Sequence, residues 1–425
     1  MQDLTSRGYN PDVGSSCPGT RRAVVIPSRE RSGDTPGRPA VETPRQWTIN
    51  GDFLRLRPTG VARYAREVTR ALDQLVLEQH PLTRGLEIGL VAPDHWREQS
   101  PLRAIGVRVV PELKPRLPQV WVQTQLPRRV RGGLLSFCNL APVSIRRHIA
   151  CIHDLHTWLM PGSYGRFFRL AHRVVLPAIG RRAARITTVS HLSRQHLIEF
   201  GIASPEKITV TYNGSDHTKR WAAERSALAP PSERPYVLCL GQNQKYKNVG
   251  LLVRLAELLD GVGLDLWMAG DAGEATISSF VSPKPDNIHV LGRISDDDFM
   301  KALSGAVCFL FPSRIEGFGL PAVEAMAAGC PVVASTSPCL PEVCGAAALY
   351  ADPDDIRGWF EAIVRLQRDA ELRRRMVEAG NAQAGAYSWR SIGEIYLGLM
   401  AQVDGVLGET QENSQGATEW QASMS

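Results

Sequence analysis

The segment Ala306–Ser335, AVCFLFPSRIEGFGLPAVEAMAAGCPVVAS, contains the pattern that decides the fold. Ala306–Phe311 is a continuous apolar run of strand length, and Leu320–Ala328 has the composition of a helix. Pro331–Ala334 is apolar and β-branched again. The segment therefore predicts a strand, a helix and a second strand, which together form one βαβ unit.

The loop between the first strand and the helix has the features of an anion-binding site. Pro321 fits the first helical turn, where a missing N–H costs nothing, and the glycines before it let the backbone approach a ligand. We expect the N–H groups at this positive helix end to be free and to suit a phosphate. They belong to Gly317, Phe318, Gly319 and Leu320. Two carboxylates flank them, because Glu316 comes just before and Glu324 lies about one turn inside the helix, about 6 Å along its axis.

Length and composition indicate a globular chain with more than one core. The chain has 425 residues, of which 43% are hydrophobic and 22% charged, enough for two domains of ordinary size. The first residues have no apolar leader, and no run of about 18 uncharged apolar residues is present, so we expect neither a signal peptide nor a spanning helix. A cytoplasmic protein is expected. Its eight scattered cysteines, without a CxxC pair, are expected to be buried thiols rather than disulfides or metal ligands.

The basic residues are concentrated in the first half of the chain, although the net charge is only +6. Two interpretations stay open, a solvated helix face and attraction to an anionic partner such as a phospholipid surface or a diphosphate-bearing acceptor. Nucleic acid is not expected, since no recognised binding motif accompanies the charge. The clusters are Arg128, Arg129 and Arg131; Arg146, Arg147 and His148; and Arg166, Arg169, His172, Arg173, Arg181, Arg182 and Arg185.

Strands and helices alternate along most of the chain, which predicts parallel sheets covered by helices on both faces. The fold class is α/β, with two doubly wound Rossmann-like domains that face a cleft. We expect a disordered extension at 1–45, a first domain at 46–216, a linker at 217–235 and a second domain at 236–386. A C-terminal helix at 387–407 is expected to pack back on the first domain, and 408–425 is expected to be a disordered tail.

In the first domain, candidate site residues follow a predicted strand. Ligands of such sheets sit beyond the carboxyl ends of strands, which draws attention to His153 and Asp154 directly after the strand IACI. Asp154 could orient the imidazole and leave its other nitrogen for a substrate, whereas the simpler interpretation is a structural hydrogen bond. Gly60, at the start of a helix, could approach a phosphate or be a plain helix-terminal glycine.

In the second domain, the loop Gly241–Asn248 carries two lysines at the corresponding place. Lys245 and Lys247 lie between a strand end and a helix start, where they could meet an anion held by the amides of Gly317–Leu320. Solvated loop lysines are the alternative interpretation.

The run Asp296–Asp298 could be taken for a DxD metal site. Ser295 followed three residues later by Asp298, ahead of a helical pattern, instead predicts a helix cap with acids in the first turn. We interpret Asp352–Asp355 in the same way, and we expect no metal and no cofactor.

At this point several segments together resemble retaining glycosyltransferases of family 4 with the GT-B fold. Glu316 and Glu324 in EGFGLPAVEAMAAGCPVVAS have the family's Glu-x7-Glu spacing. The resemblance runs from about Gln46 to Val403 and follows the family order. The other matching segments are PTGVARYAREV near the start, IHDL at 152–155, TVSHLSR at 188–194, YNGSD at 212–216, the pair Lys247-Asn248, GRISDDDF at 292–299 and YSW at 387–389.

The resemblance implies a transferase that binds a nucleotide diphosphosugar mainly in the second domain and an acceptor in the first. Glu316 would hold the donor sugar's hydroxyls and Glu324 the ribose hydroxyls, while the amides of Phe318, Gly319 and Leu320 would bind the diphosphate. Lys247 would neutralise the leaving diphosphate, and His153 would sit by the reacting sugar. Asp154 and Arg194 would lie on the acceptor side.

One position departs from the family pattern, since Gln242 stands where the family usually has Arg, directly after Gly241. A neutral amide cannot replace a bidentate guanidinium, although Lys245 could compensate.

The resemblance therefore implies a retaining, metal-independent glycosyltransferase that moves a hexosyl unit to a saccharide or lipid-linked acceptor in cell-surface polysaccharide biosynthesis. Mannosyl transfer from GDP-mannose is a guess that rests only on the kind of bacterial polysaccharide enzyme the sequence resembles, and peripheral contact with an anionic membrane at the inner face stays open. Two alternatives stay open. Gly317–Ala322 fits a loose GxGxxA, which favours an NAD-dependent oxidoreductase, and Gln242 leaves room for a non-catalytic nucleotide-sugar-binding protein.

Overall fold

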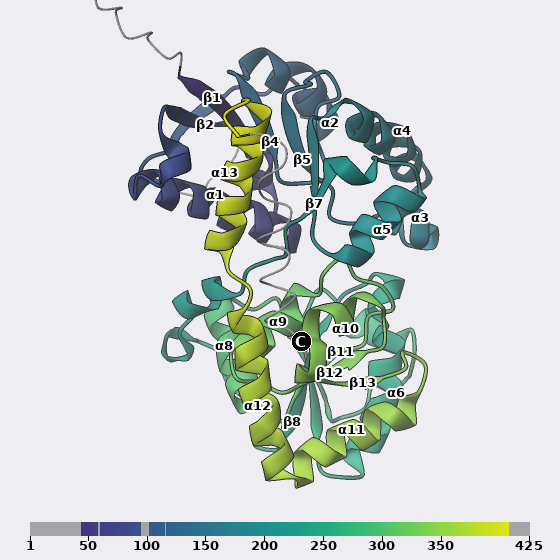
Figure 1. The fold of residues 1–425 in the computed structure, drawn as a ribbon. Coiled ribbons are helices and arrows are strands. Elements are labelled where there is room, and N and C mark those ends of the chain that lie inside the picture. The colour runs from purple at the N-terminus through teal and green to yellow at the C-terminus, as the bar shows by residue number, and fades with distance from the viewer. Residues whose placement is uncertain (1–43, 58–59, 95–101, 115, 408–425) are drawn as a thin grey trace, which may run out of the picture. The chain divides into compact units, whose positions relative to one another are not determined.

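The computed structural model describes residues 44–57, 60–94, 102–114 and 116–407. The predicted extension as far as residue 43 and the predicted tail from residue 408 lie outside these ranges. Within them the chain forms two parallel β-sheets with helices on both faces (Figure 1). Both sheets belong to one compact unit, Thr43–Ser425. The predicted fold class, two doubly wound α/β domains, is confirmed.

The first sheet has seven strands in the order β3-β2-β1-β4-β5-β6-β7, and all neighbouring strands are parallel. Its central strands β4 and β5 are buried on both faces, as their nearly all-apolar sequences require. The strands are β1 (Arg45–Asn50), β2 (Leu86–Pro93), β3 (Gly106–Val110), β4 (Gly133–Ser136), β5 (His148–Cys151), β6 (Arg185–Thr188) and β7 (Ile208–Val210). The helices of this half are α1 (Gly60–Leu77), α2 (Pro118–Val120), α3 (His156–Leu159), α4 (Arg166–Arg182) and α5 (His191–Glu199).

The second sheet has six parallel strands in the order β10-β9-β8-β11-β12-β13. The βαβ unit predicted from Ala306–Ser335 is present as β11, α9 and β12. The strands are β8 (Tyr236–Gly241), β9 (Asp265–Gly270), β10 (Ile288–Gly292), β11 (Phe309–Phe311), β12 (Val332–Ser335) and β13 (Ala348–Ala351). The helices are α6 (Val249–Asp260), α7 (Glu274–Ser278), α8 (Asp296–Gly305), α9 (Leu320–Ala327), α10 (Cys339–Cys344), α11 (Ile356–Arg368), α12 (Ala370–Gly385) and α13 (Trp389–Val403).

The last helix, α13, packs against α1 beside the first sheet (Figure 1). Its Tyr396 hydroxyl lies 3.0 Å from the Tyr64 hydroxyl and 2.7 Å from Thr187 Oγ1 on β6, and all three residues are fully buried. Burial raises the pKa of both tyrosines well above the ordinary value, so both stay protonated. At its end, Asp404 accepts hydrogen bonds from Trp47 Nε1 at 3.1 Å and Arg45 Nε at 2.7 Å, and it contacts Arg147. The helix thus supplies polar and apolar parts of the first core.

Local sequence signals set the ends of several helices. Ser190 caps α5 by accepting the Ser193 N–H. The capping box predicted from Ser295 and Asp298 is present at the start of α8, with bonds in both directions. Asp355 caps α11 by accepting the Gly358 N–H.

Short helices that propensity does not reveal were missed by the sequence analysis, among them α2, α3, α7 and α10. The seven cysteines in the described residues are free thiols and all are buried, which confirms the prediction for them. None of the helices in the described ranges combines the length and apolar composition needed to cross a bilayer.

Candidate active site

The loop from β11 to α9 presents four backbone amides at the carboxyl edge of the second sheet. Gly319 is the N-cap of α9 with φ of +95°, and no side chain caps the helix. The left-handed φ demands glycine, and a Cβ here would lie 2.6 Å from Leu340 Cδ2. Within the described residues, the amides of Gly317, Phe318, Gly319 and Leu320 make no hydrogen bond to a protein acceptor. The predicted free amides at the positive end of a helix are therefore in place.

Glu316 and Lys247 form an ion pair beside these amides. Lys247 Nζ lies 2.6 Å from Glu316 Oε1, and only 13% of the lysine and 10% of the glutamate side chain is exposed. The ammonium also lies 5.4 Å from the centre of the Phe311 ring. Lys247 belongs to a 3-10 turn after β8, so the site joins the ends of β8 and β11. The two predicted residues are therefore in contact. Because an ammonium has three donors, Lys247 can bind Glu316 and an anion at the same time.

Glu324 lies one turn inside α9, where three parts of the chain meet around it. Its Oε1 lies 2.9 Å from His217 Nε2 and 3.3 Å from Arg63 Nε of α1. Arg63 in addition binds both carboxylate oxygens of Asp296, at 2.9 and 2.6 Å. Burial lowers the pKa of the Arg63 guanidinium, but the Glu324 and Asp296 carboxylates raise it by more, so the cation is stabilised. Glu324, the second predicted acid, is thus buried next to the positively charged guanidinium of Arg63.

The sequence analysis missed His217 and Arg63. His217 falls in the segment predicted to be a linker, directly after the motif YNGSD, and Arg63 lies at the fourth position of α1. The available signals were that His217 directly follows the segment YNGSD and that Arg63 lies within the segment PTGVARYAREV. Nothing local marks either residue as a partner of Glu324.

At the carboxyl edge of the first sheet, His153 makes a structural hydrogen bond, the simpler of the two interpretations, and among the described residues no hydrogen bond joins its ring to Asp154. His153 Nε2 lies 2.8 Å from the carbonyl oxygen of Phe137, while Asp154 Oδ1 accepts the backbone N–H of His156 at 3.0 Å. Asp154 therefore stabilises the start of α3, because an aspartate close to exposed helix amides satisfies them first. Burial lowers the pKa of His153, but the Cys151 thiol and the Phe137 carbonyl raise it by more, to about 8.

A buried acidic and basic network lies at the same edge. Asp52, in the 3-10 turn after β1, contacts Arg55, and Arg55 Nη1 lies 3.3 Å from Glu112 Oε1. The side chains of all three are less than a tenth exposed. Burial raises the pKa of Asp52 to about 7, and the attraction of Arg55 offsets only part of this effect.

The other predicted site residues have the following surroundings. Gly60 begins α1 with open space where a Cβ would stand. Gln242 is half-buried after β8, and Lys245 is exposed in the 3-10 turn. Arg194 Nη2 donates to the carbonyl oxygen of Pro205 at 3.3 Å.

The edges of the two sheets touch at Gly317. Ser193 Oγ on α5 donates to the carbonyl oxygen of His153 at 2.9 Å and lies 3.4 Å from that of Gly317. A Cβ on Gly317 would lie 3.0 Å from the His153 oxygen. Nearby, Glu342 of α10 accepts the first two amides of α5, His191 N–H at 2.6 Å and Leu192 N–H at 3.1 Å. The motif IHDL is therefore next to the amides of Gly317–Leu320.

The three consecutive aspartates at the start of α8 bind protein groups. Asp296 pairs with Arg63, Asp297 pairs with Arg225, and Asp298 accepts the Ser226 hydroxyl at 2.7 Å. The interpretation of this run as a helix cap rather than a DxD site is confirmed by the capping box.

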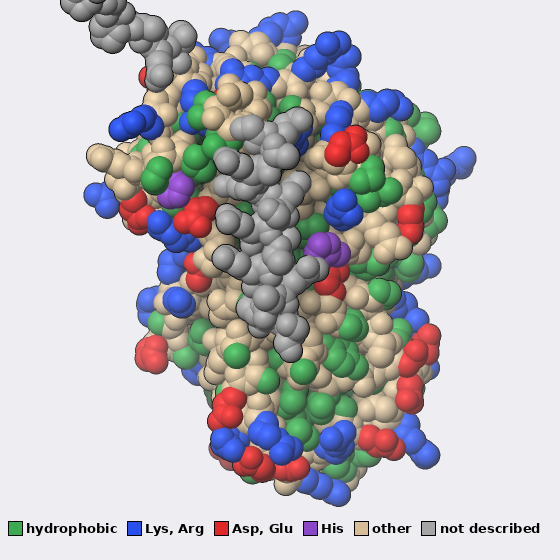
Figure 2. Space-filling view, viewed as in Figure 1, with side chains coloured by type: hydrophobic (Ala, Val, Ile, Leu, Met, Phe, Trp, Pro, Cys, Tyr) green, Lys and Arg blue, Asp and Glu red, His purple; other side chains and the backbone are tan. Residues whose placement is uncertain are grey.

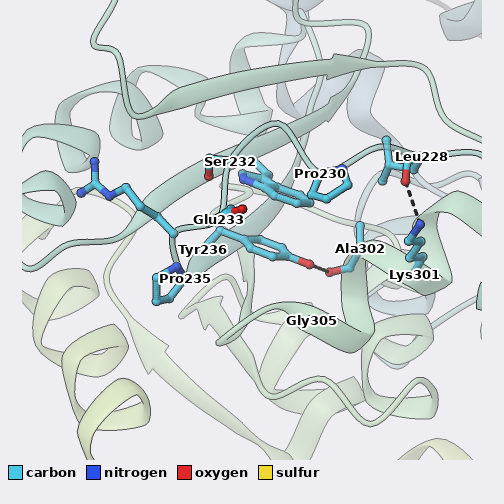
Figure 3. A pocket seen from close by; sticks show the side chains of 11 residues that line it. Leu228, Pro230, Ser232, Glu233, Pro235, Tyr236, Lys301, Ala302 and Gly305 are labelled. Carbon is cyan, nitrogen blue, oxygen red and sulfur yellow. Dashed lines mark hydrogen bonds between the residues drawn. The ribbon is translucent and has the colours of Figure 1, made fainter.

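A cavity of about 420 Å³ lies away from this site (Figure 3). It is lined by the segment Leu228–Tyr236 and by α8, at the amino end of β8. Two of its polar groups are bound to backbone carbonyls, since Lys301 Nζ donates to Leu228 at 2.8 Å and the Tyr236 hydroxyl to Ala302 at 2.8 Å. Ligands of parallel sheets bind at the opposite, carboxyl edge.

Comparisons with known proteins agree with this geometry. Residues 58–219 match the family model described as Glycosyltransferase Family 4, and residues 222–383 match the model described as Glycosyl transferases group 1. O-antigen chain mannosyltransferase B of Escherichia coli is 29% identical over 59% of this chain and 69% of its own length. A GDP-mannose-dependent phosphatidylinositol monomannoside mannosyltransferase of Corynebacterium glutamicum is 25% identical over 65% of this chain and 74% of its own length.

Solved structures share the fold at low sequence identity. Sucrose-phosphate synthase from Thermosynechococcus elongatus aligns with a TM-score of 0.65 and 18% identity, covering 85% of this chain and all of that one. WaaG, a glycosyltransferase involved in lipopolysaccharide biosynthesis, aligns with a TM-score of 0.61 and 15% identity, covering 84% and 99%.

The two sheets have the GT-B fold, with the amides and acids at their facing edges. The matching family models make the class of protein a glycosyltransferase. The chain belongs to glycosyltransferase family 4.

Proposed function

We propose that this protein transfers a mannosyl unit from GDP-mannose to a saccharide or lipid-linked acceptor in cell-surface polysaccharide biosynthesis, with retention of configuration. The observation that carries the proposal is the set of uncapped amides at Gly317–Leu320 between two acids, the largely buried Glu316 and the buried Glu324. The names of similar mannosyltransferases, two of which concern O-antigen chains, support the choice of sugar and pathway.

Each part of the donor has a partner in this arrangement. We propose that Glu316 binds hydroxyls of the sugar and Glu324 those of the ribose, while the diphosphate lies on the amides. His153, whose backbone meets Gly317, would line the side from which the acceptor comes. Asp154 and Arg194 would lie farther along that side.

Breaking the bond between the sugar and the diphosphate builds negative charge on the departing oxygen. Fixed N–H dipoles at the start of α9 and the Lys247 ammonium would stabilise this charge, because they already point to where it develops. The aspartates that could have suggested a metal site are bound to Arg63, Arg225 and Ser226. These contacts support transfer without a metal ion or cofactor.

The test is transfer by the purified protein to a lipid-linked saccharide, with GDP-mannose and UDP-glucose compared as donors. We expect mannosyl transfer that persists in excess EDTA, and an α-linked product by NMR. A product of inverted configuration would contradict the stereochemistry, and transfer from UDP-glucose alone would contradict the donor. Reduction of NAD, or donor binding without transfer, would favour the two alternative functions.

A lipid-linked acceptor requires the protein to reach a membrane surface, and α4 supports this part of the proposal. Phe167, Leu170 and Val174 recur at helical spacing and are 91%, 62% and 62% exposed. Exposed Arg166 and Arg173 flank them on the same helix. Hydrophobic and basic side chains adjoin at this edge of the molecule (Figure 2). Aromatic and apolar side chains with flanking arginines are typical of interfacial helices on anionic lipids.

Vesicle binding tests the membrane surface. We expect the protein to sediment with phosphatidylglycerol vesicles, and a Phe167→Ser, Leu170→Ser variant to lose most of this binding while it still turns over a water-soluble acceptor. Phe280→Ser is the matched control, since Phe280 is 56% exposed on the second half of the chain. Equal sedimentation of both variants would contradict the assignment to α4.

A further inference from the structure

We infer that His217 and Trp389 form a positioning relay that fixes the carboxylate of Glu324 for the donor's ribose. The inference rests on the proposed function, because it takes Glu324 as the ribose ligand. Neither residue is part of the loop that presents the amides of Gly317–Leu320, and neither is one of the two acids beside it. The relay would make the choice between ribose and deoxyribose nucleotides depend on a helix far along the chain.

The hydrogen bonds of the His217 ring define one tautomer. Trp389 Nε1 lies 3.0 Å from His217 Nδ1, and His217 Nε2 lies 2.9 Å from Glu324 Oε1. An indole N–H can only donate, so Nδ1 must be the acceptor and carries no proton. The ring proton therefore sits on Nε2 and is donated to Glu324.

The relay is buried and held from both sides. His217 is 0% exposed, Trp389 3% and Glu324 5%. The His217 ring lies 5.2 Å from the ring of Trp221 and 5.9 Å from that of Trp389. The Trp389 backbone N–H donates to Asp216 Oδ1 at 3.0 Å. A Cβ on Gly214 would lie 2.4 Å from the Trp389 nitrogen, so the two segments are in direct contact.

The contacts fall on one oxygen of Glu324. Both His217 and Arg63 approach Oε1, and among the described residues no hydrogen bond falls on Oε2. Arg63 supplies the countercharge and is shared with Asp296, whereas His217 supplies a single directed donor. A carboxylate anchored at one oxygen keeps the other in a fixed direction, which suits recognition of ribose hydroxyls.

Calorimetric binding of GDP, 2′-deoxy-GDP and 3′-deoxy-GDP tests the relay. We expect the wild type to bind GDP about tenfold or more tightly than the weaker deoxy analogue, since a hydrogen bond to a charged group is lost. In His217→Phe, which keeps a ring of similar size but cannot donate, we expect this preference to fall to about twofold. The affinity for the 2′,3′-dideoxy nucleotide should change little.

Conservative variants separate positioning from packing. His217→Gln can donate an amide N–H to Glu324, and we expect it to recover most of the ribose preference. Trp389→Phe keeps an aromatic ring but leaves Nδ1 without its donor, so the preference should fall to an intermediate value. This variant serves as the test if His217→Phe does not fold, as judged by its thermal transition.

His289→Phe is the matched control, because His289 Nε2 lies 2.8 Å from a carboxylate oxygen of Asp265 in the same half of the chain. It should keep the wild-type preference. The inference is overturned if folded His217→Phe or Trp389→Phe keeps the full ribose preference, or if the control loses it equally. A wild type that binds GDP without any ribose preference overturns the role of Glu324, and one that binds no nucleotide overturns the proposed function itself.

Discussion

The carboxyl edges of the two sheets have the same topology but hold their polar groups in different ways. In the first sheet, His153 is bonded to the Phe137 carbonyl and Asp154 to the His156 amide. In the second sheet, the amides of Gly317–Leu320 have no protein acceptor within the described residues. The edge with unsatisfied groups is the one that the family resemblance assigns to the donor.

The difference shows how a site is distinguished from a structural edge. Buried polar groups are normally paired, so amides that stay unpaired at a helix end mark a place where a ligand can complete the structure. The paired groups of the first edge instead stabilise that edge itself. Mutations around the amides of Gly317–Leu320 should therefore reduce turnover, whereas mutation of the buried network at the first edge should change stability.

The largest effect is expected from Glu316→Ala and Lys247→Ala, each of which should cut turnover by roughly 100-fold or more, or about 3 kcal/mol. Because Lys247 Nζ and Glu316 Oε1 are 2.6 Å apart, the double variant should lose less than the product of the two single losses. Steady-state transfer kinetics measure all three.

Circular dichroism of these variants is the control, since the fold should stay intact. Wild-type rates in both single variants would remove the basis for placing the donor at this edge.

A smaller effect is expected from glycine substitutions that compare the two helix starts. Gly319→Ala forces a left-handed residue against Leu340, which should cost about 1–3 kcal/mol of stability and disturb donor binding. Gly60→Ala, at the start of α1, meets no atom within 4 Å and should change neither property. Thermal unfolding measures the change in stability, and GDP titration measures the change in donor binding. Loss of donor binding in Gly60→Ala would instead place a phosphate at the first edge.

At the first edge, the expected effect is a pH dependence of stability. Because burial raises the pKa of Asp52 from 3.8 to about 7, the folded protein binds more protons than the unfolded chain between these values. The contribution of Asp52 to stability is therefore present at low pH and is lost as the pH rises through about 7. Relative to Asp52→Asn, wild-type stability should fall by about 1.4 kcal/mol per pH unit within this window.

Denaturant unfolding at pH 5, 6, 7 and 8 measures the difference. A stability difference between wild type and Asp52→Asn that stays constant from pH 5 to pH 8 would show that Arg55 dominates and that Asp52 is ionised throughout.

The parts of the fold that depend on local pattern could be predicted from the sequence. The apolar runs gave the strands of both sheets, and Ser190, Ser295 and Asp355 marked helix starts because a cap acts within one turn. The start of α9 was predictable for the same reason, since Gly319 and Pro321 act on their own backbone.

The residues around Glu324 could not be predicted, because they come together only through packing. Arg63 and His217 are more than 100 positions before Glu324 in the chain, and neither has a local signature. The pairing of Asp154 with His153 failed for a related reason, since two adjacent residues need not face each other. The carboxylate of Asp154 instead accepts the His156 N–H at the start of α3.

The return of α13 to the first sheet has a consequence for biosynthesis. Tyr396 and Asp404 complete hydrogen bonds that begin at Tyr64, Trp47 and Arg45, more than 300 residues earlier. The ribosome synthesises the chain from the N-terminus. The first half therefore lacks these hydrogen-bond partners until the second half has been translated. The first half can therefore complete its core only after α13 has been synthesised, which couples the folding of the two halves.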